Sequence, residues 1–296
     1  MKTIITQIIP TIQGEGLTVG TPILLIRIGN CNLECTFCDS KWSNSLKFKD
    51  IKNFNKKSKK LPFIVDGDTI DDFINCINDE FLNKFTISTI LITGGEPLMN
   101  KEFVGSLIYN KNTNLKNITK IEIETNGVLL NDPKDYLLFF HWDKQIQLNV
   151  SPKLDPKYYR SEKIKTIDDI ISLFDKNRID SFEKILEDTP TVINWKFVYS
   201  KSAEADIDSF ITQIRNVNSI SIMPLTPDYT KYKSEIKFLE DFRKSTYSAL
   251  DYCMRKGYAL SSRMHVWIFN NFEHRDEYVD VRKGQLPPAK AGGLSK

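Results

Sequence analysis

The sequence has little of several features that mark whole classes of protein. Its 296 residues include only five cysteines and three histidines, and 41 basic residues stand against 38 acidic ones, a net charge of +3. So small a surplus argues against wide binding to nucleic acid or membranes. No apolar run approaches the roughly 18–20 residues that cross a bilayer. The 41% hydrophobic content instead predicts an ordinary globular protein with a sizeable core.

The first residues also lack the marks of a secretory signal. They read "MKTIITQIIPTIQGEG", in which Gln7, Pro10 and Gln13 interrupt the apolar stretch and no small-residue cleavage site follows. We therefore expect a strand here and a cytoplasmic protein, with no membrane partner and no direct contact to nucleic acid. Cytoplasmic thiols stay reduced, so a tight cysteine cluster indicates a metal or redox site rather than disulfides.

Short apolar runs recur along the chain, each followed by a longer amphipathic or polar stretch. Their Ile, Val and Leu content is typical of parallel strands buried on both faces. Helical spacing of apolar residues predicts helices at 69–85 and 235–256. About six strand–helix units predict an α/β fold, a full or partial barrel with active-site loops at the carboxyl ends of the strands. The expected strands are 23–29, 89–93, 121–125, 146–151, 194–199, 219–225 and 265–269.

We expect one domain over residues 1–270 with two insertions. Residues 41–62 hold eight lysines and are predicted to form a solvated loop, the alternative being a helix that contacts an acidic partner or a polyanion. Residues 155–190 are predicted to form a second, polar and helical insertion. Residues 271–296 form a C-terminal extension that ends in "LPPAKAGGLSK" and shows no periodicity, so we expect it to be partly disordered.

Three of the five cysteines fall within eight positions, in "CNLECTFC". Cys31, Cys35 and Cys38 come just after an expected strand, and Gly29 and Asn30 permit the tight turn that a metal loop needs. Zinc would take a fourth ligand, usually Cys or His. A four-iron cluster on three cysteines keeps one iron open to a small molecule. The spacing favours the cluster, but it leaves zinc and coincidence open.

Three further motifs follow expected strands, where an α/β barrel has its active site. Each taken alone is an ordinary strand–turn element. Paired glycines also let the backbone approach a ligand, and a lysine with a hydroxyl suits a carboxylate or a ribose. The motifs are "GGEP" (94–97), "ETNG" (124–127) and "SPK" (151–153).

The cysteine motif and "GGEP" resemble those of the radical S-adenosylmethionine (SAM) superfamily. The resemblance implies a partial (β/α)6-type radical SAM barrel with helical and loop insertions. It implies a [4Fe–4S] cluster on Cys31, Cys35 and Cys38, with SAM on the fourth iron as the source of a 5′-deoxyadenosyl radical. The residues that would contact SAM are Phe37, Gly94, Gly95, Glu96, Asn126, Ser151 and Lys153.

The segment "IQGEG" (12–16) narrows the resemblance from the superfamily to one family within it. Together with "GTPILLIRIGNCNLECTFCDS" (20–40) it resembles the 7-carboxy-7-deazaguanine synthase (QueE) family, which carries Q-G-E-G, G-x-P, G-C-N-L and C-D-T in this order. This implies a Mg²⁺-assisted ring contraction of 6-carboxy-5,6,7,8-tetrahydropterin to 7-carboxy-7-deazaguanine with loss of ammonia, in the pathway to queuosine and other 7-deazapurines. It also implies a homodimer and an electron donor such as flavodoxin.

The same resemblance implies the substrate and magnesium residues. Arg27 also breaks the apolar strand "LLIRIG", which by itself favours an inward functional role. Two positions depart from the family pattern: Ser40 replaces a threonine and keeps its hydroxyl, while Arg263 replaces a glutamine and adds a positive charge. Mg²⁺ would bind Ser40, and the substrate would contact Gln13, Gly14, Glu15, Arg27 and His265.

Two other interpretations stay open at this point. One is a different radical SAM enzyme, such as an activase for a glycyl-radical protein, whose large partner would contact residues 41–62. The other is a zinc or iron–sulfur module without catalysis. That module would leave "GGEP" and "SPK" without an explanation.

Overall fold

The computed structural model describes residues 1–44, 46–55, 61–109, 115–130, 145–174, 191–214, 220–228 and 231–269. The predicted extension 271–296 lies outside the described residues, as do parts of both predicted insertions. None of the described helices is long and apolar enough to cross a membrane.

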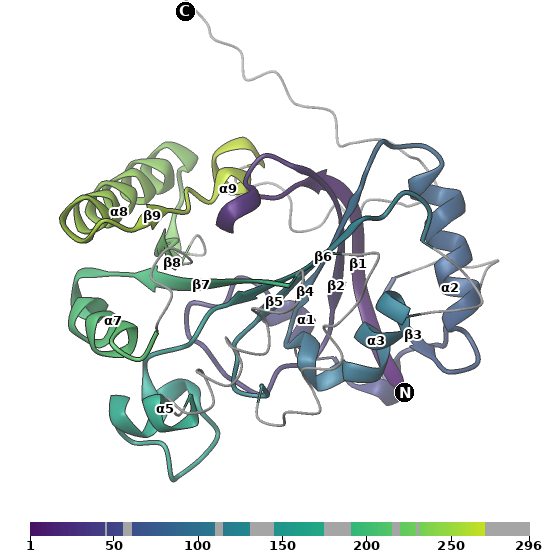
Figure 1. The fold of residues 1–296 in the computed structure, drawn as a ribbon, viewed down its shortest axis with the longest axis horizontal. Coiled ribbons are helices and arrows are strands. Elements are labelled where there is room, and N and C mark those ends of the chain that lie inside the picture. The colour runs from purple at the N-terminus through teal and green to yellow at the C-terminus, as the bar shows by residue number, and fades with distance from the viewer. Residues whose placement is uncertain are drawn as a thin grey trace, which may run out of the picture.

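A single nine-stranded sheet, in the order β3-β1-β2-β4-β5-β6-β7-β8-β9, forms the centre of the described chain (Figure 1). Neighbours from β2 to β9 are parallel, whereas β1 pairs antiparallel with β2 and β3. The sheet stays open, so the α/β fold is a partial barrel. The strands are β1 (Lys2–Ile12), β2 (Pro22–Ile28), β3 (Phe63–Asp66), β4 (Thr89–Gly94), β5 (Lys120–Thr125), β6 (Gln145–Val150), β7 (Val192–Tyr199), β8 (Ile220–Pro224) and β9 (Ala259–Leu260).

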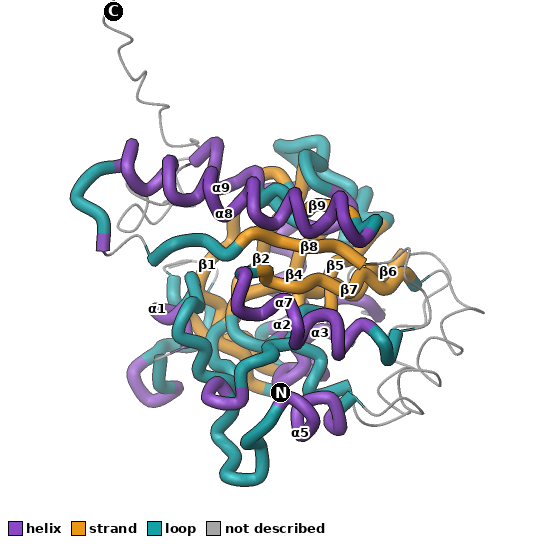
Figure 2. Tube along the Cα trace, turned by 90° about the vertical axis from the view of Figure 1, so that its left-hand side faces the viewer, coloured by secondary structure: helices purple, strands orange, loops and turns teal. Residues whose placement is uncertain are grey.

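The helices pack on the sheet through one hydrophobic core that joins its apolar face to α2, α3, α5, α7 and α8. Figure 2 shows α8 running along the sheet at β8 and β9, the strands that it contacts most. The predicted helix 235–256 is confirmed as α8. The helices are α1 (Lys41–Asn44), α2 (Ile70–Ile77), α3 (Lys101–Tyr109), α5 (Ile167–Leu173), α7 (Glu204–Ile211), α8 (Glu235–Lys256) and α9 (Met264–Phe269).

One expected strand is wrong. Residues 265–269 form most of the helix α9 rather than a strand. The apolar run "HVWIF" is too short to distinguish the two by periodicity. Its fully buried residue, Val266, packs with Phe238 and Phe242 of α8, which a helical turn permits. The expected strands 23–29, 89–93, 121–125, 146–151, 194–199 and 219–225 are confirmed as β2, β4, β5, β6, β7 and β8.

The central strands are buried on both faces, as expected, but one of these faces is polar. Residues of a strand alternate between the two faces of its sheet. The residues between the apolar ones in "IEIE", "IQLN", "INWK" and "SISI" therefore share a face, and they hydrogen-bond to one another across strands. This polar interior comprises Glu122, Glu124, Gln147, Asn149, Asn194, Lys196 and Ser221.

Stability should depend on the aromatic packing between α2 and the sheet. Phe73 is fully buried, with the rings of Phe54, Phe63 and Phe103 at 5.7, 6.0 and 5.9 Å. We expect Phe73→Ala to lower the free energy of unfolding by about 3–5 kcal/mol, because it leaves a cavity. Phe48→Ala is the matched control, since Phe48 is 41% exposed. Urea unfolding of both variants measures the difference, and equal losses would contradict the described core.

Candidate active site

The cysteine loop, residues 29–40, follows β2 directly and is fixed at its base. The Gly29 N–H donates to the Ile4 carbonyl at 2.9 Å, and Asn30 adopts a left-handed φ of 67° that turns the chain into Cys31. Asparagine is one of the few residues besides glycine that tolerate this conformation. The turn expected from Gly29 and Asn30 is therefore present at the carboxyl end of β2.

The three thiols of this loop are partly exposed and lie within electrostatic reach of one another. Burial raises the pKa of each thiol, to about 11 at Cys35, and the charge of Lys153 opposes this rise. Among the described residues, no three His, Cys, Asp or Glu side chains are placed to hold one metal ion. The three thiols are thus electrostatic neighbours at the carboxyl end of β2.

Strand β4 ends at Gly94, and the next residue, Gly95, lies against the cysteine loop. The Gly95 N–H donates to the Ile28 carbonyl at 2.9 Å, and the Glu96 N–H donates to the Asn30 carbonyl at 2.8 Å. A Cβ on Gly95 would lie 1.5 Å from the Asn30 oxygen. Gly94 has a φ of 118°, which side chains disfavour. Gly94 is therefore required by its backbone angle and by the close approach of β2, and Gly95 by the close approach of Asn30 in the cysteine loop.

The buried Glu96 joins the ends of β4 and β5. Its carboxylate accepts hydrogen bonds from the Thr125 hydroxyl at 2.6 Å and from the N–H groups of Asn126 and Leu98 at 2.7 and 3.0 Å. Burial raises the pKa of Glu96, and these bonds oppose that rise. The Asn126 amide in turn donates to Asn32 Oδ1 at 2.7 Å. Both expected SAM residues, Glu96 and Asn126, thus belong to one network with the cysteine loop.

Phe37, Ser151 and Lys153 also meet at this loop. Lys153 Nζ lies 5.9 Å from the centroid of the Phe37 ring, within the range of a cation–π contact, and donates to Ser151 Oγ at 2.8 Å. The Phe37 ring packs edge-on against Tyr158, with 5.3 Å between centroids. The Tyr158 carbonyl accepts from the Glu34 N–H at 2.8 Å. The first residues of the predicted insertion therefore brace the cysteine loop.

A second cluster surrounds Glu15, the acidic residue of "QGEG". Its carboxylate accepts from Lys196 Nζ at 2.7 Å and from Arg263 Nε at 2.9 Å. The Lys196 side chain is 2% exposed and also pairs with Glu124. Burial alone would raise the pKa of Glu15, but the two cations bring it well below its usual range. Glu15 is therefore ionised at neutral pH.

The residues on either side of Glu15 hold it in place. Gln13 Nε2 donates to the buried Glu122 at 2.8 Å, and Gln13 Oε1 accepts from the Glu15 N–H at 3.2 Å. The Gly14 carbonyl accepts from the Met264 N–H at 2.8 Å. A Cβ on Gly14 would lie 1.9 Å from His265 Nδ1. "QGEG" therefore needs its first glycine because α9 packs directly onto it, and Figure 1 shows α9 beside this connection.

Arg27 and Ser40 form the link between the two clusters. Arg27 Nη1 donates to Ser40 Oγ at 2.7 Å, and Arg27 Nε donates to Gln7 Oε1 at 3.0 Å. The Ser40 hydroxyl donates to Asp39 Oδ1 at 3.2 Å. Because Asp39 follows Cys38 directly, the three thiols and the Glu15 cluster adjoin at the carboxyl ends of the strands. All the sequence-predicted site residues lie in these two clusters or in the link between them.

Sequence reasoning missed Lys196, Glu124 and Asp39 as members of the site. The alternation of polar and apolar residues within "IEIET" and "INWKF" is the signal that identifies the first two. Polar residues at every second position of otherwise apolar strands predict a polar inner face. Asp39 lies inside "CDS", where the family resemblance implies a role for the adjacent Ser40 only. Nothing in the sequence shows that it pairs with Arg263, which is 224 positions away.

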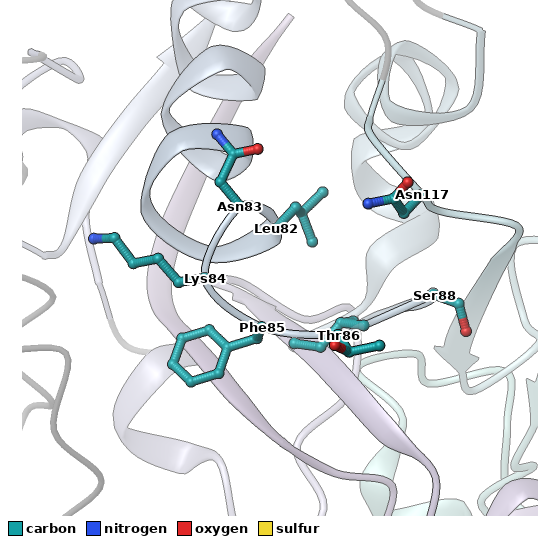
Figure 3. A pocket seen from close by; sticks show the side chains of 8 residues that line it. Leu82, Asn83, Lys84, Phe85, Thr86, Ser88 and Asn117 are labelled. Atoms are coloured by element: carbon teal, nitrogen blue, oxygen red, sulfur yellow. The ribbon is translucent and has the colours of Figure 1, made fainter.

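The structure also contains a cavity of about 300 Å³ away from this site (Figure 3). It is bounded by residues 82–88 and Asn117. Ser88 directly precedes β4, so the cavity lies at the amino ends of the strands. The cavity contains none of the predicted site residues, and we assign it no role in the chemistry.

Replacing Gly95 should disturb the cysteine loop specifically. We expect Gly95→Ala to lower the iron and sulfide bound after anaerobic reconstitution severalfold, because its Cβ would displace the Asn30 carbonyl. Gly67→Ala is the control, since a Cβ there meets nothing within 4 Å. Iron and sulfide analysis measures both variants. Full loading of Gly95→Ala would show that the close approach of β4 is dispensable.

His265 should stay neutral far below the usual histidine range. Its burial, and then the charge of Arg263, lower its pKa from 6.5 to about 4. Because the unfolded chain binds this proton more readily, His265 should reduce stability progressively as the pH falls from about 6.5 to 4. Proton NMR of iron-free protein should show one of three histidines titrating near 4, and His265→Gln should remove that signal. Titration of all three near 6.5 would contradict the described packing.

Comparison with known proteins agrees with this geometry. Residues 25–176, about half of the chain, match the model of the radical SAM superfamily. A 7-carboxy-7-deazaguanine synthase of Rickettsia prowazekii is 35% identical over 135 residues, which are 45% of this chain and 48% of that protein. This chain thus spans about half the length of that relative. A synthase of the same name from Halobacterium salinarum is 26% identical over 276 residues, 90% of each chain.

Among solved structures, QueE from Escherichia coli has a TM-score of 0.52 at 18% identity, covering 90% of this chain and 95% of that one. At this identity the likeness concerns the fold alone. It agrees with the open α/β barrel described above. The match of the family model, together with the three-cysteine loop and the paired glycines against it, shows that the chain belongs to the radical SAM superfamily.

Proposed function

We propose that this protein is a 7-carboxy-7-deazaguanine synthase, a carbon–nitrogen lyase that contracts the ring of 6-carboxy-5,6,7,8-tetrahydropterin. The observation that carries the proposal is the junction of two clusters: Glu15 and Arg27 adjoin the cysteine loop through Asp39 and Ser40. A radical SAM enzyme needs its substrate beside the cluster. These charged groups provide such a place for a small polar acid.

The residues of the cysteine loop fit the cofactors of the superfamily, a [4Fe–4S] cluster and SAM. The donor set is three partly exposed thiols, which suits a cluster with one open iron. The backbone of Gly95 lies beside the loop, and its N–H donates to the Ile28 carbonyl just before it. Lys153, Ser151 and Phe37 offer a cation, a hydroxyl and an aromatic ring for the rest of SAM. When bound, the pair supplies the carbon radical that starts the reaction.

Arg27 and Glu15 suit the two ends of the pterin. In the described residues the Arg27 guanidinium donates to neutral acceptors, the Gln7 amide and the Ser40 hydroxyl, and burial lowers its pKa. A partly buried guanidinium that donates to neutral groups can bind a carboxylate strongly. The ionised Glu15 can accept hydrogen bonds from pterin N–H groups. His265, neutral at pH 7, can donate one hydrogen bond and accept another.

Ser40 is the residue that we propose for Mg²⁺. Its oxygen has two lone pairs, and one of them accepts from Arg27. The other is available to a cation, and Mg²⁺ completes its octahedron with water and substrate oxygens where protein ligands are few. Ser40 would therefore hold the ion between the substrate and the cysteine loop.

The wider assignment follows from the same proposal. Residues 1–270 would form one radical SAM domain, with a small-molecule substrate and a one-electron donor such as flavodoxin. A homodimer and a place in the pathway to queuosine and other 7-deazapurines belong to the proposal as well. No contact of the described residues favours an activase or a zinc module over the synthase.

An anaerobic assay tests the proposal. Protein reconstituted with iron and sulfide, then supplied with reductant, SAM, Mg²⁺ and 6-carboxytetrahydropterin, should give 7-carboxy-7-deazaguanine by mass spectrometry. Cys35→Ala should abolish the product, because it removes a cluster ligand. Cys76→Ala is the matched control and should keep it, since Cys76 lies on α2. Accumulation of 5′-deoxyadenosine without product would mean a radical SAM enzyme for another substrate.

A further inference from the structure

The chain that leaves the cysteine loop stays in contact with it. Helix α1 begins at Lys41, three positions after Cys38. Lys41 Nζ donates to the Thr36 carbonyl at 2.6 Å, and Asn44 Nδ2 donates to Cys38 Sγ at 3.8 Å. Burial raises the pKa of Cys38, and the charge of Lys41 is among the groups that oppose this rise. The first turn after the loop therefore lies directly beside Cys38.

Positive charge is concentrated in the segment that starts with this helix. Residues 41–44 and 46–52 contain four lysines and a single acidic residue, Asp50. Their surplus of +3 equals the net charge of the whole chain, so the other residues are balanced in charge. A surface of this kind attracts acidic partners and raises the rate at which they arrive. The four lysines are all exposed, and they are Lys41, Lys47, Lys49 and Lys52.

Two exposed aromatic rings are interleaved with these lysines along the chain. Trp42 is 43% exposed and Phe48 is 41% exposed, although both side chains are large and apolar. Aromatic residues that stand among charged ones are typical anchors of protein–protein interfaces. The docking segment is defined here as Lys41, Trp42, Lys47, Phe48, Lys49 and Lys52.

The thiols beside this segment are themselves close to the surface. Cys31, Cys35 and Cys38 are partly exposed, so a cluster held by them would lie near solvent where the segment begins. An electron passes between two proteins efficiently only when their redox centres come close together. Redox encounters also need only small interfaces, below about 1,200 Å² of total buried surface. A short segment can therefore supply much of such an interface.

We propose that the docking segment binds an acidic one-electron donor protein and places the redox centre of that protein against the cysteine loop. The lysines attract the carboxylates of the donor, and the two rings pack on its surface. One electron moves: a flavin hydroquinone anion becomes the neutral semiquinone, and [4Fe–4S]²⁺ becomes [4Fe–4S]⁺. No proton moves in this step. The inference deepens the proposed function, on which the need for a donor rests.

The position of the docking segment favours an electron donor over a nucleic acid. Lysines and aromatic rings together also bind single-stranded nucleic acid. A nucleic acid could use such a surface anywhere on the molecule, whereas an electron donor must bind beside the cysteine loop. The segment begins three positions after Cys38 and contacts the loop through Lys41. This placement is the reason for choosing the donor.

Binding of oxidised flavodoxin, an acidic flavoprotein, tests the inference without turnover. It is titrated by calorimetry into the reconstituted protein at low salt, without reductant, SAM or pterin. We expect Lys47→Glu with Lys49→Glu to lower the affinity about tenfold or more, because two attractive charges become repulsive. Lys84→Glu with Lys116→Glu is the matched control and should bind as the wild type does. Both of its lysines are exposed, and they precede β4 and β5 at the amino ends of the strands.

The aromatic part of the docking segment is tested separately. Phe48→Ala should lower the affinity for flavodoxin severalfold, because the donor loses an apolar anchor. Its affinity should fall with added salt as steeply as that of the wild type, since no charge is removed. Tyr247→Ala is the matched control, because Tyr247 lies on α8 and is 63% exposed.

The rate of cluster reduction separates docking from damage to the cluster. Flavodoxin hydroquinone must bind the protein before it gives its electron, whereas dithionite is a small reductant that needs no protein interface. Electron paramagnetic resonance of the reduced cluster follows both reactions. In Lys47→Glu with Lys49→Glu, reduction by flavodoxin should slow about tenfold at low salt. Reduction by dithionite should keep the rate of the wild type.

Three results would overturn the inference: no binding of flavodoxin to the wild type, unchanged affinity in Lys47→Glu with Lys49→Glu, or equal slowing with both reductants. Unchanged affinity for flavodoxin together with lost affinity for single-stranded DNA would assign the segment to a polyanion instead. Failure of the proposed function is distinct, because neither measurement uses a pterin. A protein that binds flavodoxin through this segment but forms no 7-carboxy-7-deazaguanine would refute the synthase alone.

Discussion

The ion pairs around Glu15 are the interaction on which the rest of the site depends. A carboxylate taken out of water is strongly destabilising unless cations and hydrogen-bond donors replace the water. Here Lys196 comes from the middle of the sheet and Arg263 from the segment after β9, and both donate to Glu15. The same two cations also hold Glu124 and Asp39. The ion pairs that these two cations form therefore fix the loops that surround Glu15.

The polar interior of the open barrel extends this network inward. Glu122 accepts from Gln13 and Thr18, and Asn149 donates to both acidic residues of β5. Networks of this kind are stable only when nearly every buried group is satisfied. A single substitution in the network therefore disturbs the hydrogen bonds of its neighbours as well. The same connectivity makes the network a rigid support for Glu15. The apolar face of the same strands supplies the ordinary hydrophobic stabilisation against the helices.

Local chemistry explains which features the sequence predicted. Each predicted motif consists of residues that are close together in the sequence, and each sets the local geometry of the backbone. These motifs are the cysteine spacing, the paired glycines and "QGEG". The alternation that would have placed Lys196 and Glu124 on the inner face was present, but the apolar content of the same strands obscured it. Asp39 and Arg263 could not be paired from the sequence, because their contact depends on how the whole sheet curves. The short run at 265–269 was misassigned because one helical turn and one short strand have the same apolar content.

The separation of Glu15 and Arg263 by 248 positions has a consequence for folding. Among the described contacts, residues 31–38 of the cysteine loop have partners no farther along the chain than Arg160. The contact with Arg263, in contrast, closes a loop of almost the whole described chain. Closing so long a loop loses more chain entropy than closing a short one, so this contact forms late in folding. A ribosome that has released residues 1–200 has therefore exposed all three cysteines of the loop, together with Lys196, but not yet Arg263, the partner that Glu15 shares with Asp39. Cluster loading can precede formation of the contacts between Glu15, Asp39 and Arg263, so the order of synthesis itself separates the two events.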